Sequence, residues 1–309
     1  MKNHLPSAVI LLALLLVLCL HAFAAEDRTG PETHTLLSSQ TGYLFTAQEP
    51  PSPAFSPALG RAAAMGPRTT PDVLVNGRSI GPMTPRMMVE GEAYLSPIPV
   101  LKAFCPSIQL KYSNGSLTGS APGLHFVANV GKAYFMVNDR YLYAPHGVLE
   151  QDGTVFLPAA PLAKALGCTI QGGGEGDDLV FKQVCTPVAE GVYDEESLYW
   201  LSRAIFSESG NQPMNGRIAV GTVILNRVAN EAFPNTVKEV VFAPNQFSPV
   251  AIGTIYRDPD EDSIVAAKLC FDGTREAGES LYFNTTTMYS WADQSRELVC
   301  TIGGHNFYL

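Results

Sequence analysis

A single carboxylate, Glu208, falls on the apolar face of a predicted helix. Leu201, Ala204 and Ile205 recur at helical spacing, and the helix is expected to have Asp194 as its N-cap and to end at Gly210. Glu208 follows the three apolar residues by seven, four and three positions. At about 100° per residue these positions share one side of a helix. A carboxylate on that side requires a reason to be there.

Two effects would raise the pKa of the Glu208 carboxyl group. Partial burial disfavours its charged form, and the last turn of a helix carries the negative end of the helix dipole. A carboxyl group that keeps its proton near neutral pH can protonate a glycosidic oxygen. The pattern alone leaves two other interpretations open: a solvent-exposed glutamate, or one that a hydrogen bond in the core satisfies.

A second carboxylate, which a hydrolytic mechanism would need as nucleophile or to hold a water, is harder to find. The available candidates form one acidic group: Asp258, Asp260, Glu261 and Asp262. We expect this group to begin a helix, with Pro259 at its first position, rather than to act in catalysis.

The residues around Glu208 belong to a long motif. Its first and longest part is residues 202–242, SRAIFSESGNQPMNGRIAVGTVILNRVANEAFPNTVKEVVF. Four shorter parts follow: NQFS at 245–248, LYFN at 281–284, Trp291 and HNFY at 305–308. Over residues 194–309 this motif resembles the spore-cortex-lytic cell-wall hydrolases of the SleB and CwlJ type. The resemblance implies a mainly α, lysozyme-like catalytic domain that acts on peptidoglycan, with Glu208 at the catalytic position.

The resemblance also implies how one carboxyl group could suffice. A lytic transglycosylase cleaves between N-acetylmuramic acid and N-acetylglucosamine, and the C6 hydroxyl of the sugar itself attacks the anomeric carbon. Glu208 would donate a proton to the leaving oxygen and then accept one from that hydroxyl. Two alternatives stay open, a non-catalytic cell-wall-binding protein and an inverting muramidase.

Several neighbours are candidates for binding the saccharide: Gln246, Ser248, Tyr282, Asn284 and Trp291. The first two flank an apolar residue in a loop, where an ordinary turn is the alternative. Tyr282 and Asn284 alternate in a predicted strand, so both would point to the same side. The same pair resembles the Tyr-Asn element of lysozyme-like transglycosylases, in which Tyr282 would be a hydrogen-bond partner of Glu208.

Trp291 could stack on a sugar face, although a lone tryptophan is more often part of a core. Many relatives carry a basic residue beside this tryptophan, whereas this chain has YSWAD at 289–293. We therefore expect binding of the glycan strand to be altered.

The histidines and cysteines favour neither a metal enzyme nor a thiol enzyme. A peptidase could pair Cys270 with His305, but Cys270 lies in a predicted helix that ends at Gly273, a poor place for an activated thiolate. His305 is the only histidine after residue 191, which excludes a zinc amidase site, and we expect a structural role for it. No cofactor and no metal are expected.

Five cysteines lie after residue 24: Cys105, Cys168, Cys185, Cys270 and Cys300. Cys168 with Cys185 and Cys270 with Cys300 are possible bridges in an exported protein, and free thiols are the alternative.

Residues 1–24 are typical of a secretory signal peptide. Lys2 and His4 precede an apolar run from Ala8 to Leu20, and AFA at 22–24 supplies a cleavage site. The run is shorter than the roughly 20 residues of a membrane-spanning helix. We expect an exported, soluble protein, with lipid attachment at Cys19 or an uncleaved anchor as alternatives. Residues 25–71, rich in proline, are expected to form a disordered linker.

An internal repeat occupies residues 72–182. A shift of 62 residues places VNGR (75–78) over VNDR (137–140) and YL (94–95) over FL (156–157). Each copy predicts a strand and turn, a second short strand, a proline-led helix (99–104 and 161–166) and a closing strand. The two copies together resemble the copper amine oxidase N-terminal-like domain. Its histidines, His125 and His146, lack a third ligand, so no copper site is expected.

The predicted organisation is therefore multidomain. A small α+β repeat domain, which either binds the wall or acts as a spacer, precedes a linker at 183–191 and the catalytic domain at 192–309.

Composition narrows the choice of partners. The 309 residues are 46% hydrophobic and 16% charged, and 29 acidic against 20 basic residues give a net charge of −9. This balance argues against nucleic acid or an anionic membrane surface as a partner. The expected partners are peptidoglycan glycan strands, in the cell wall or spore cortex of a Gram-positive-type bacterium. An activating protein partner, and the choice between spore cortex and vegetative wall, stay open.

Overall fold

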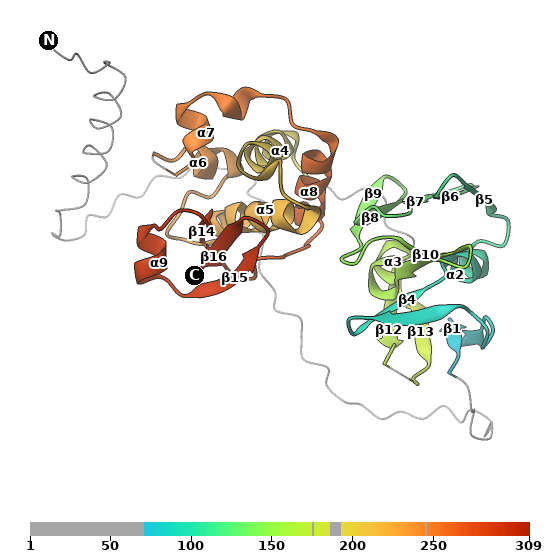
Figure 1. The fold of residues 1–309 in the computed structure, drawn as a ribbon. Coiled ribbons are helices and arrows are strands. Elements are labelled where there is room, and N and C mark those ends of the chain that lie inside the picture. Colours follow the sequence, from blue (N-terminus) through green and yellow to red (C-terminus); the bar gives the residue numbers. More distant parts are fainter. Residues whose placement is uncertain (1–70, 175, 186–192, 245) are drawn as a thin grey trace, which may run out of the picture. The chain divides into compact units, whose positions relative to one another are not determined.

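A computed structural model describes residues 71–309, apart from 175, 186–192 and 245 (Figure 1). The predicted signal peptide, nearly all of the proline-rich linker and most of the 183–191 linker lie outside the described residues. The described residues fall within one compact unit, residues 64–309. In the part of the chain that the structure describes, no helix combines the length and the apolar character needed to cross a membrane.

The segment 71–185 is built mainly from short strands, with two short helices, α2 (Pro97–Phe104) and α3 (Ala159–Ala165). The strands are β1 (Val73–Val75), β2 (Arg78–Ser79), β3 (Arg86–Val89), β4 (Glu92–Leu95), β5 (Gln109–Ser113), β6 (Ser116–Ala121), β7 (Leu124–Asn129), β8 (Tyr134–Val137), β9 (Arg140–Tyr143), β10 (Leu149–Gln151), β11 (Thr154–Pro158), β12 (Cys168–Gly172) and β13 (Leu179–Gln183). They form three sheets with the orders β12-β13-β1-β2, β10-β11-β4-β3 and β5-β6-β7-β8-β9.

The internal repeat is visible in the strand pairing. β4 and β11 occupy corresponding places in the two copies and pair antiparallel, with Leu95 opposite Leu157, its counterpart 62 residues later. The two VN turns also correspond, because each joins an antiparallel hairpin and each places two residues at positive φ. In the second copy Asp139 (φ 63°) stands where the first copy has Gly77 (φ 76°).

Two details of the predicted repeat were wrong. Both helices begin two residues earlier than expected, at Pro97 and Ala159. In α2 it is Pro97, not Pro99, that takes the first helical position, where the fixed φ of proline suits the helix and no amide donor is needed. The share of strands was also underestimated, because the meander β5–β9 consists of strands of only four to six residues joined by tight turns such as Asn114-Gly115.

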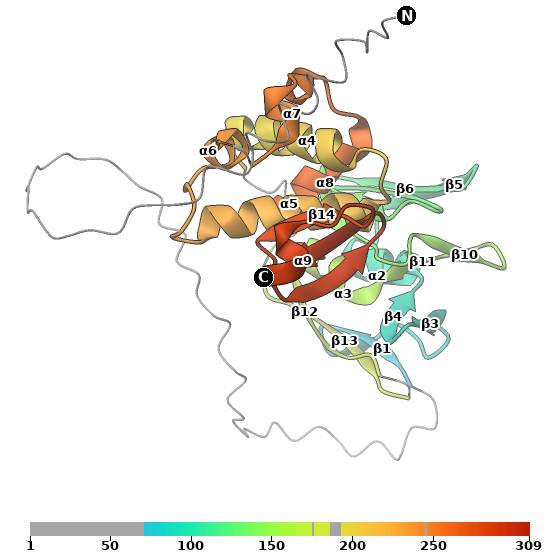
Figure 2. The same ribbon diagram turned by 60° about the vertical axis from the view of Figure 1, so that its left-hand side comes forward.

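The segment 193–309 is mainly helical and carries one small sheet (Figure 2). Its helices are α4 (Glu195–Ser209), α5 (Met214–Ala229), α6 (Val237–Phe242), α7 (Ser248–Ala251), the short 3-10 helix η1 (Thr254–Tyr256), α8 (Glu261–Phe271) and α9 (Trp291–Ser295). The sheet has the order β14-β16-β15, from β14 (Tyr282–Thr285), β15 (Leu298–Ile302) and β16 (His305–Tyr308). α5 contacts both β14 and β15.

The first helix of this segment has the predicted ends. Asp194 is the N-cap of α4, and its carboxylate accepts the backbone N–H groups of Glu196 (3.0 Å) and Ser197 (2.9 Å). Gly210 is the C-cap. The predicted start of α8 was wrong by two positions, since Asp260 is its N-cap and Glu261, not Pro259, is its first residue. The Asp260 side chain takes the capping place because it accepts the N–H of Ser263 at 2.8 Å.

Three helices, α4, α5 and α8, pack on one another around Gly221. A Cβ atom at this residue would lie 2.7 Å from Sγ of Cys270 on α8 and 2.9 Å from Cδ1 of Ile205 on α4. Because such distances are too short for any side chain, glycine at this place allows the helices to approach. This packing fixes the direction of α4, which carries Glu208.

Candidate active site

Glu208 lies in the last turn of α4, on the face predicted from its spacing. Its side chain is half-buried, between the fully buried Ile205 and Ser209. Among the described residues its carboxyl group makes no hydrogen bond or ion pair, so the alternative of a glutamate satisfied in the core does not hold. Burial raises the pKa of Glu208 to about 7. A substantial fraction of this carboxyl group is therefore protonated at neutral pH.

The end of α4 is held by Arg217, a buried residue near the start of α5. Its guanidinium donates to the carbonyl oxygens of Gly210 and, from Nε at 3.0 Å, Gln212. Its Nη1 donates to Oδ1 of Asp260 at 2.6 Å and to Oγ of Ser263 at 2.7 Å. A cation beside the last carbonyls of α4 offsets the negative end of the helix dipole.

The loop after α4 is also tied to the sheet. Oε1 of Gln212 accepts the backbone N–H of Gly304 at 2.8 Å, in the turn between β15 and β16. A Cβ atom at Gly303 would lie 2.3 Å from the same oxygen. The positive φ of Gly303 (55°) and this close approach together require a residue without a side chain.

A second buried arginine, Arg227, joins several elements that carry predicted substrate-binding residues. Its Nε donates to the carbonyl oxygen of Leu281 at 2.7 Å, and its Nη1 donates to Oε1 of Gln246 at 3.1 Å. The guanidinium carbon lies 5.4 Å from the ring centre of Tyr282 and 5.2 Å from that of Phe233. Arg227 thus connects α5, the loop before α7 and the start of β14.

Sequence reasoning missed both arginines, although a signal was present. Arg217, Val220, Ile224 and Arg227 are spaced by three, four and three residues, so the arginines share the buried stripe of α5. The argument that singled out Glu208 applies equally to these two cations.

Tyr282 and Trp291 form an edge-to-face pair with ring centres 5.2 Å apart. Trp291 is 55% exposed, so it is not a core residue. The guanidinium of Arg296 lies over both rings, 4.7 Å from Tyr282 and 5.4 Å from Trp291. Arg296 thus places a cation against Trp291, although no basic residue stands beside the tryptophan in the sequence, and the expected change in glycan binding stays a prediction.

The hydroxyl of Tyr282 accepts a hydrogen bond from Nη2 of Arg296 at 3.3 Å. Within the described part of the chain it makes none with Glu208, so the expected hydrogen bond between the two is absent from this conformation.

Asn284 forms hydrogen bonds with residues on both sides of Trp291. Its Nδ2 donates to Oγ of Ser290 at 2.8 Å and to Oδ2 of Asp293 at 2.7 Å. Asp293 accepts two further groups, the N–H of Ser290 at 2.6 Å and the hydroxyl of Tyr308 at 2.5 Å. These hydrogen bonds, led by that of Tyr308, lower the pKa of Asp293 to about 2. The Asn284 amide thus positions Trp291 at the start of α9.

The other two predicted binding residues, Gln246 and Ser248, are both exposed. Ser248 is the first residue of α7, and α7 packs against α4, the helix of Glu208. The structure therefore connects Gln246, Tyr282, Asn284 and Trp291 through shared partners, and connects Ser248 to Glu208 only through the packing of their helices.

The remaining candidate groups are inert in this structure. All five described cysteines are free, so neither possible bridge is formed. Cys270 is fully buried, and burial raises its pKa to about 12, which is the opposite of an activated thiolate. His305 is buried between Phe283 and Phe307, and burial lowers its pKa. The described residues contain no group of three or more His, Cys, Asp or Glu side chains able to hold a metal ion.

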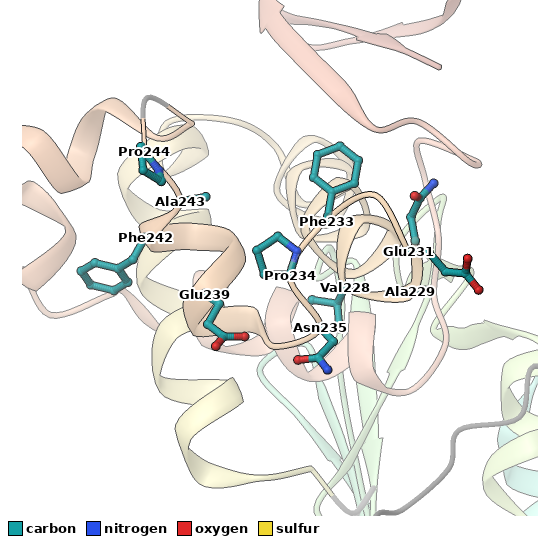
Figure 3. Close-up of a pocket in the computed structure, with 11 residues that line it drawn as sticks. Val228, Ala229, Glu231, Phe233, Pro234, Asn235, Glu239, Phe242, Ala243 and Pro244 are labelled. Carbon is teal, nitrogen blue, oxygen red and sulfur yellow. The ribbon is translucent and has the colours of Figure 1, made fainter. Parts of the chain in front are cut away.

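A pocket of about 890 Å³ opens where the end of α5, the following turn and α6 meet (Figure 3). We call it the distal pocket. Its lining residues are Val228, Ala229, Asn230, Glu231, Phe233, Pro234, Asn235, Glu239, Phe242, Ala243 and Pro244. Phe233 belongs both to this pocket and to the ring cluster around Arg227.

The candidate residues combine a half-buried protonatable acid at the end of α4 with the half-buried Tyr282 on β14 and the exposed Trp291 on α9. This combination is typical of proteins that act on carbohydrates. The comparisons agree with this class: residues 211–308 match the family described as Cell Wall Hydrolase. The match begins three residues after Glu208.

Curated relatives include two spore cortex-lytic enzymes. The enzyme of Bacillus cereus is 38% identical over 116 residues, which cover 37% of this chain and 45% of that protein. The enzyme of Bacillus subtilis (strain 168) is 35% identical over 118 residues, which cover 38% of this chain and 39% of that protein. The chain thus matches less than half of the length of these relatives. A solved structure, the catalytic domain of the Bacillus cereus SleB protein, is 35% identical and covers 38% of this chain and 93% of that one, with a TM-score of 0.36.

Proposed function

We propose that this chain is an exported enzyme that degrades peptidoglycan in a bacterial cell wall or spore cortex, acting as a lytic transglycosylase. The observation that carries the proposal is the Glu208 carboxyl group, half-buried at the end of α4, with its pKa raised to about 7. The match of residues 211–308 to cell wall hydrolases and the spore cortex-lytic relatives support peptidoglycan as the substrate.

In the proposed reaction Glu208 acts first as an acid and then as a base. The protonated carboxyl group donates its proton to the oxygen that links N-acetylmuramic acid to N-acetylglucosamine, and the bond from that oxygen to the anomeric carbon breaks. The C6 hydroxyl oxygen of the muramic acid forms a bond to the same carbon. Its proton passes to the Glu208 carboxylate, so the product is a 1,6-anhydro sugar and no water is consumed.

The surrounding carboxylates support a mechanism with one acid. Asp260 is engaged by Arg217 and by the N-terminus of α8, and Asp258 pairs with Arg203 at 2.7 Å. Asp293, two residues after Trp291, accepts hydrogen bonds on both oxygens, and its pKa of about 2 makes it a weak base. An inverting muramidase would need one of these groups to activate a water.

The test is mass spectrometry of the fragments released from purified peptidoglycan, with and without muramic lactam, by the native chain and by Glu208→Gln. Fragments that end in 1,6-anhydromuramic acid, and that disappear with the variant, are expected. Reducing ends would instead indicate a muramidase and an unassigned second carboxylate. Retention on the sacculus without any release of fragments would indicate a binding protein.

A further inference from the structure

The distal pocket has the lining of a saccharide site. Its lining includes the aromatic residues Phe233 and Phe242 and the amide residues Asn230 and Asn235. Figure 3 labels Phe233, Phe242 and Asn235. Aromatic rings pack against the C–H faces of sugars, while amides donate and accept hydrogen bonds with hydroxyl and acetamido groups. The volume of about 890 Å³ is within the range of roughly 300–1,000 Å³ for ligand pockets.

Phe233, which lines the pocket, is also the first of three aromatic residues whose rings contact one another in turn. The ring centre of Phe233 lies 6.2 Å from that of Tyr282, and that of Tyr282 lies 5.2 Å from that of Trp291. We call these three residues the aromatic strip. It leads from the exposed Trp291 on α9, across the first residue of β14, into the distal pocket.

Two arginines hold the aromatic strip in place. The Arg227 guanidinium lies 5.2 Å from the Phe233 ring centre and 5.4 Å from that of Tyr282, and Arg296 bridges Tyr282 and Trp291 in the same way. Arg227 is only 5% exposed and is anchored by the Leu281 carbonyl. The rings are thus preorganised, which lowers the entropy cost of binding a ligand across them.

We propose that the distal pocket binds further N-acetylated sugar units of the glycan strand whose bond Glu208 cleaves. The proposal rests on the proposed function, since it assigns the pocket to the polymer that Glu208 is proposed to cleave. Glu231 and Glu239 in the lining can accept hydrogen bonds from sugar hydroxyls. As far as the structure describes the pocket, no lysine or arginine lines it to receive the carboxylates of a stem peptide.

Calorimetric titration of the full-length Glu208→Gln protein tests the proposal. The probes are peptide-free glycan strands of one, three and six disaccharides, and isolated stem peptides. We expect affinity to rise with strand length. Phe233→Ala and Asn235→Ala should each weaken binding of the longest strand by about tenfold and leave the shortest unchanged. Tyr112→Ala, at an exposed aromatic residue on β5, is the matched control and should change neither.

Three outcomes would overturn the proposal. One is that Phe233→Ala lowers the affinity equally at every strand length while Asn235→Ala does not lower it. Phe233 would then only support the Tyr282 ring and would not contact the glycan. Another is binding of isolated stem peptides that both substitutions abolish, which would make the pocket a peptide site. The third is an affinity independent of strand length in the parent protein.

Turnover by the native chain is measured separately. Length-dependent binding without any turnover would reject the proposed function and support glycan binding in the distal pocket. Turnover combined with any of the three outcomes above would support the proposed function and reject glycan binding in the distal pocket.

Discussion

The two described segments differ in what they bury. In 71–185 the interior is formed mainly by apolar side chains, and its buried polar residues are Asp72, Thr84 and Ser96. In 193–309 the interior also contains Arg217, Arg227 and His305, with Glu208 at its edge. Burying an ionisable group costs free energy unless it is well compensated. The segment that buries more of these groups is the one with the candidate active site, as expected where pKa values are tuned for chemistry.

The buried charges of the second segment differ in how they are compensated. Arg217 has four acceptors, and Arg227 has two acceptors and a set of aromatic rings. Glu208 has no hydrogen-bond partner among the described residues and is compensated only by holding its proton. The arginines therefore stabilise the fold, whereas Glu208 weakens it and supplies chemistry.

The largest expected effect is that of Arg217→Met. The change removes the four hydrogen bonds of the Arg217 guanidinium and leaves the carbonyl oxygens of Gly210 and Gln212 without this donor, so the free energy of unfolding should fall by about 3 kcal/mol. Arg78→Met, at an exposed residue of β2, is the control and should change it by less than about 0.5 kcal/mol. Urea unfolding measures both free energies. Similar losses for the two variants would contradict the claim that the buried arginine stabilises the second segment.

The next effect is the pH dependence of stability that Glu208 causes. Its pKa rises from 4.5 to about 7 in the folded chain, so the folded state holds the proton more tightly. The stability from this proton is fully present below about pH 4.5 and is lost as the pH rises through 7, a difference on the order of 3 kcal/mol.

Glu208→Gln removes this titration and leaves all others in place. Urea unfolding at pH 5 and pH 8 should show a steeper loss for the native chain than for the variant. Parallel losses would mean that Glu208 is not compensated by its proton.

A smaller effect is expected for Trp291→Ala. Loss of the exposed ring should lower the rate of release of peptidoglycan fragments by about tenfold through weaker stacking, with an unchanged Tm. Met288→Ala is a suitable control, because Met288 is 66% exposed in the loop that leads to Trp291. Equal rates for the two variants would count against the aromatic strip.

The smallest effect concerns the repeat. Asp139→Gly should raise the free energy of unfolding by about 0.5 kcal/mol, because Asp139 has a φ of 63° that glycine adopts more easily. Gly77→Asp, the reciprocal change at the corresponding turn of the first copy, should lower it by a similar amount. Differential scanning calorimetry of both variants would detect shifts of opposite sign, and shifts of the same sign would contradict the equivalence of the two turns.

Local patterns were sufficient for part of this structure. Asp194 and Gly210 mark the ends of α4 because capping depends on a few adjacent residues. The repeat was visible because duplicated turns keep most of their residue types, as VNGR at 75–78 and VNDR at 137–140 show. The meander β5–β9 was missed, since strands of a few residues have too little periodicity to stand out.

The sequence alone determined which side of α4 carries Glu208, because helical periodicity depends only on spacing. It also contained the long motif that resembles cell-wall hydrolases. Only the tertiary structure decided that Arg296 covers Trp291, that Arg227 joins Gln246 to β14, and that Asn284 holds a loop. These contacts link residues between 5 and 54 positions apart, and their partners are chosen by packing, which local spacing does not encode.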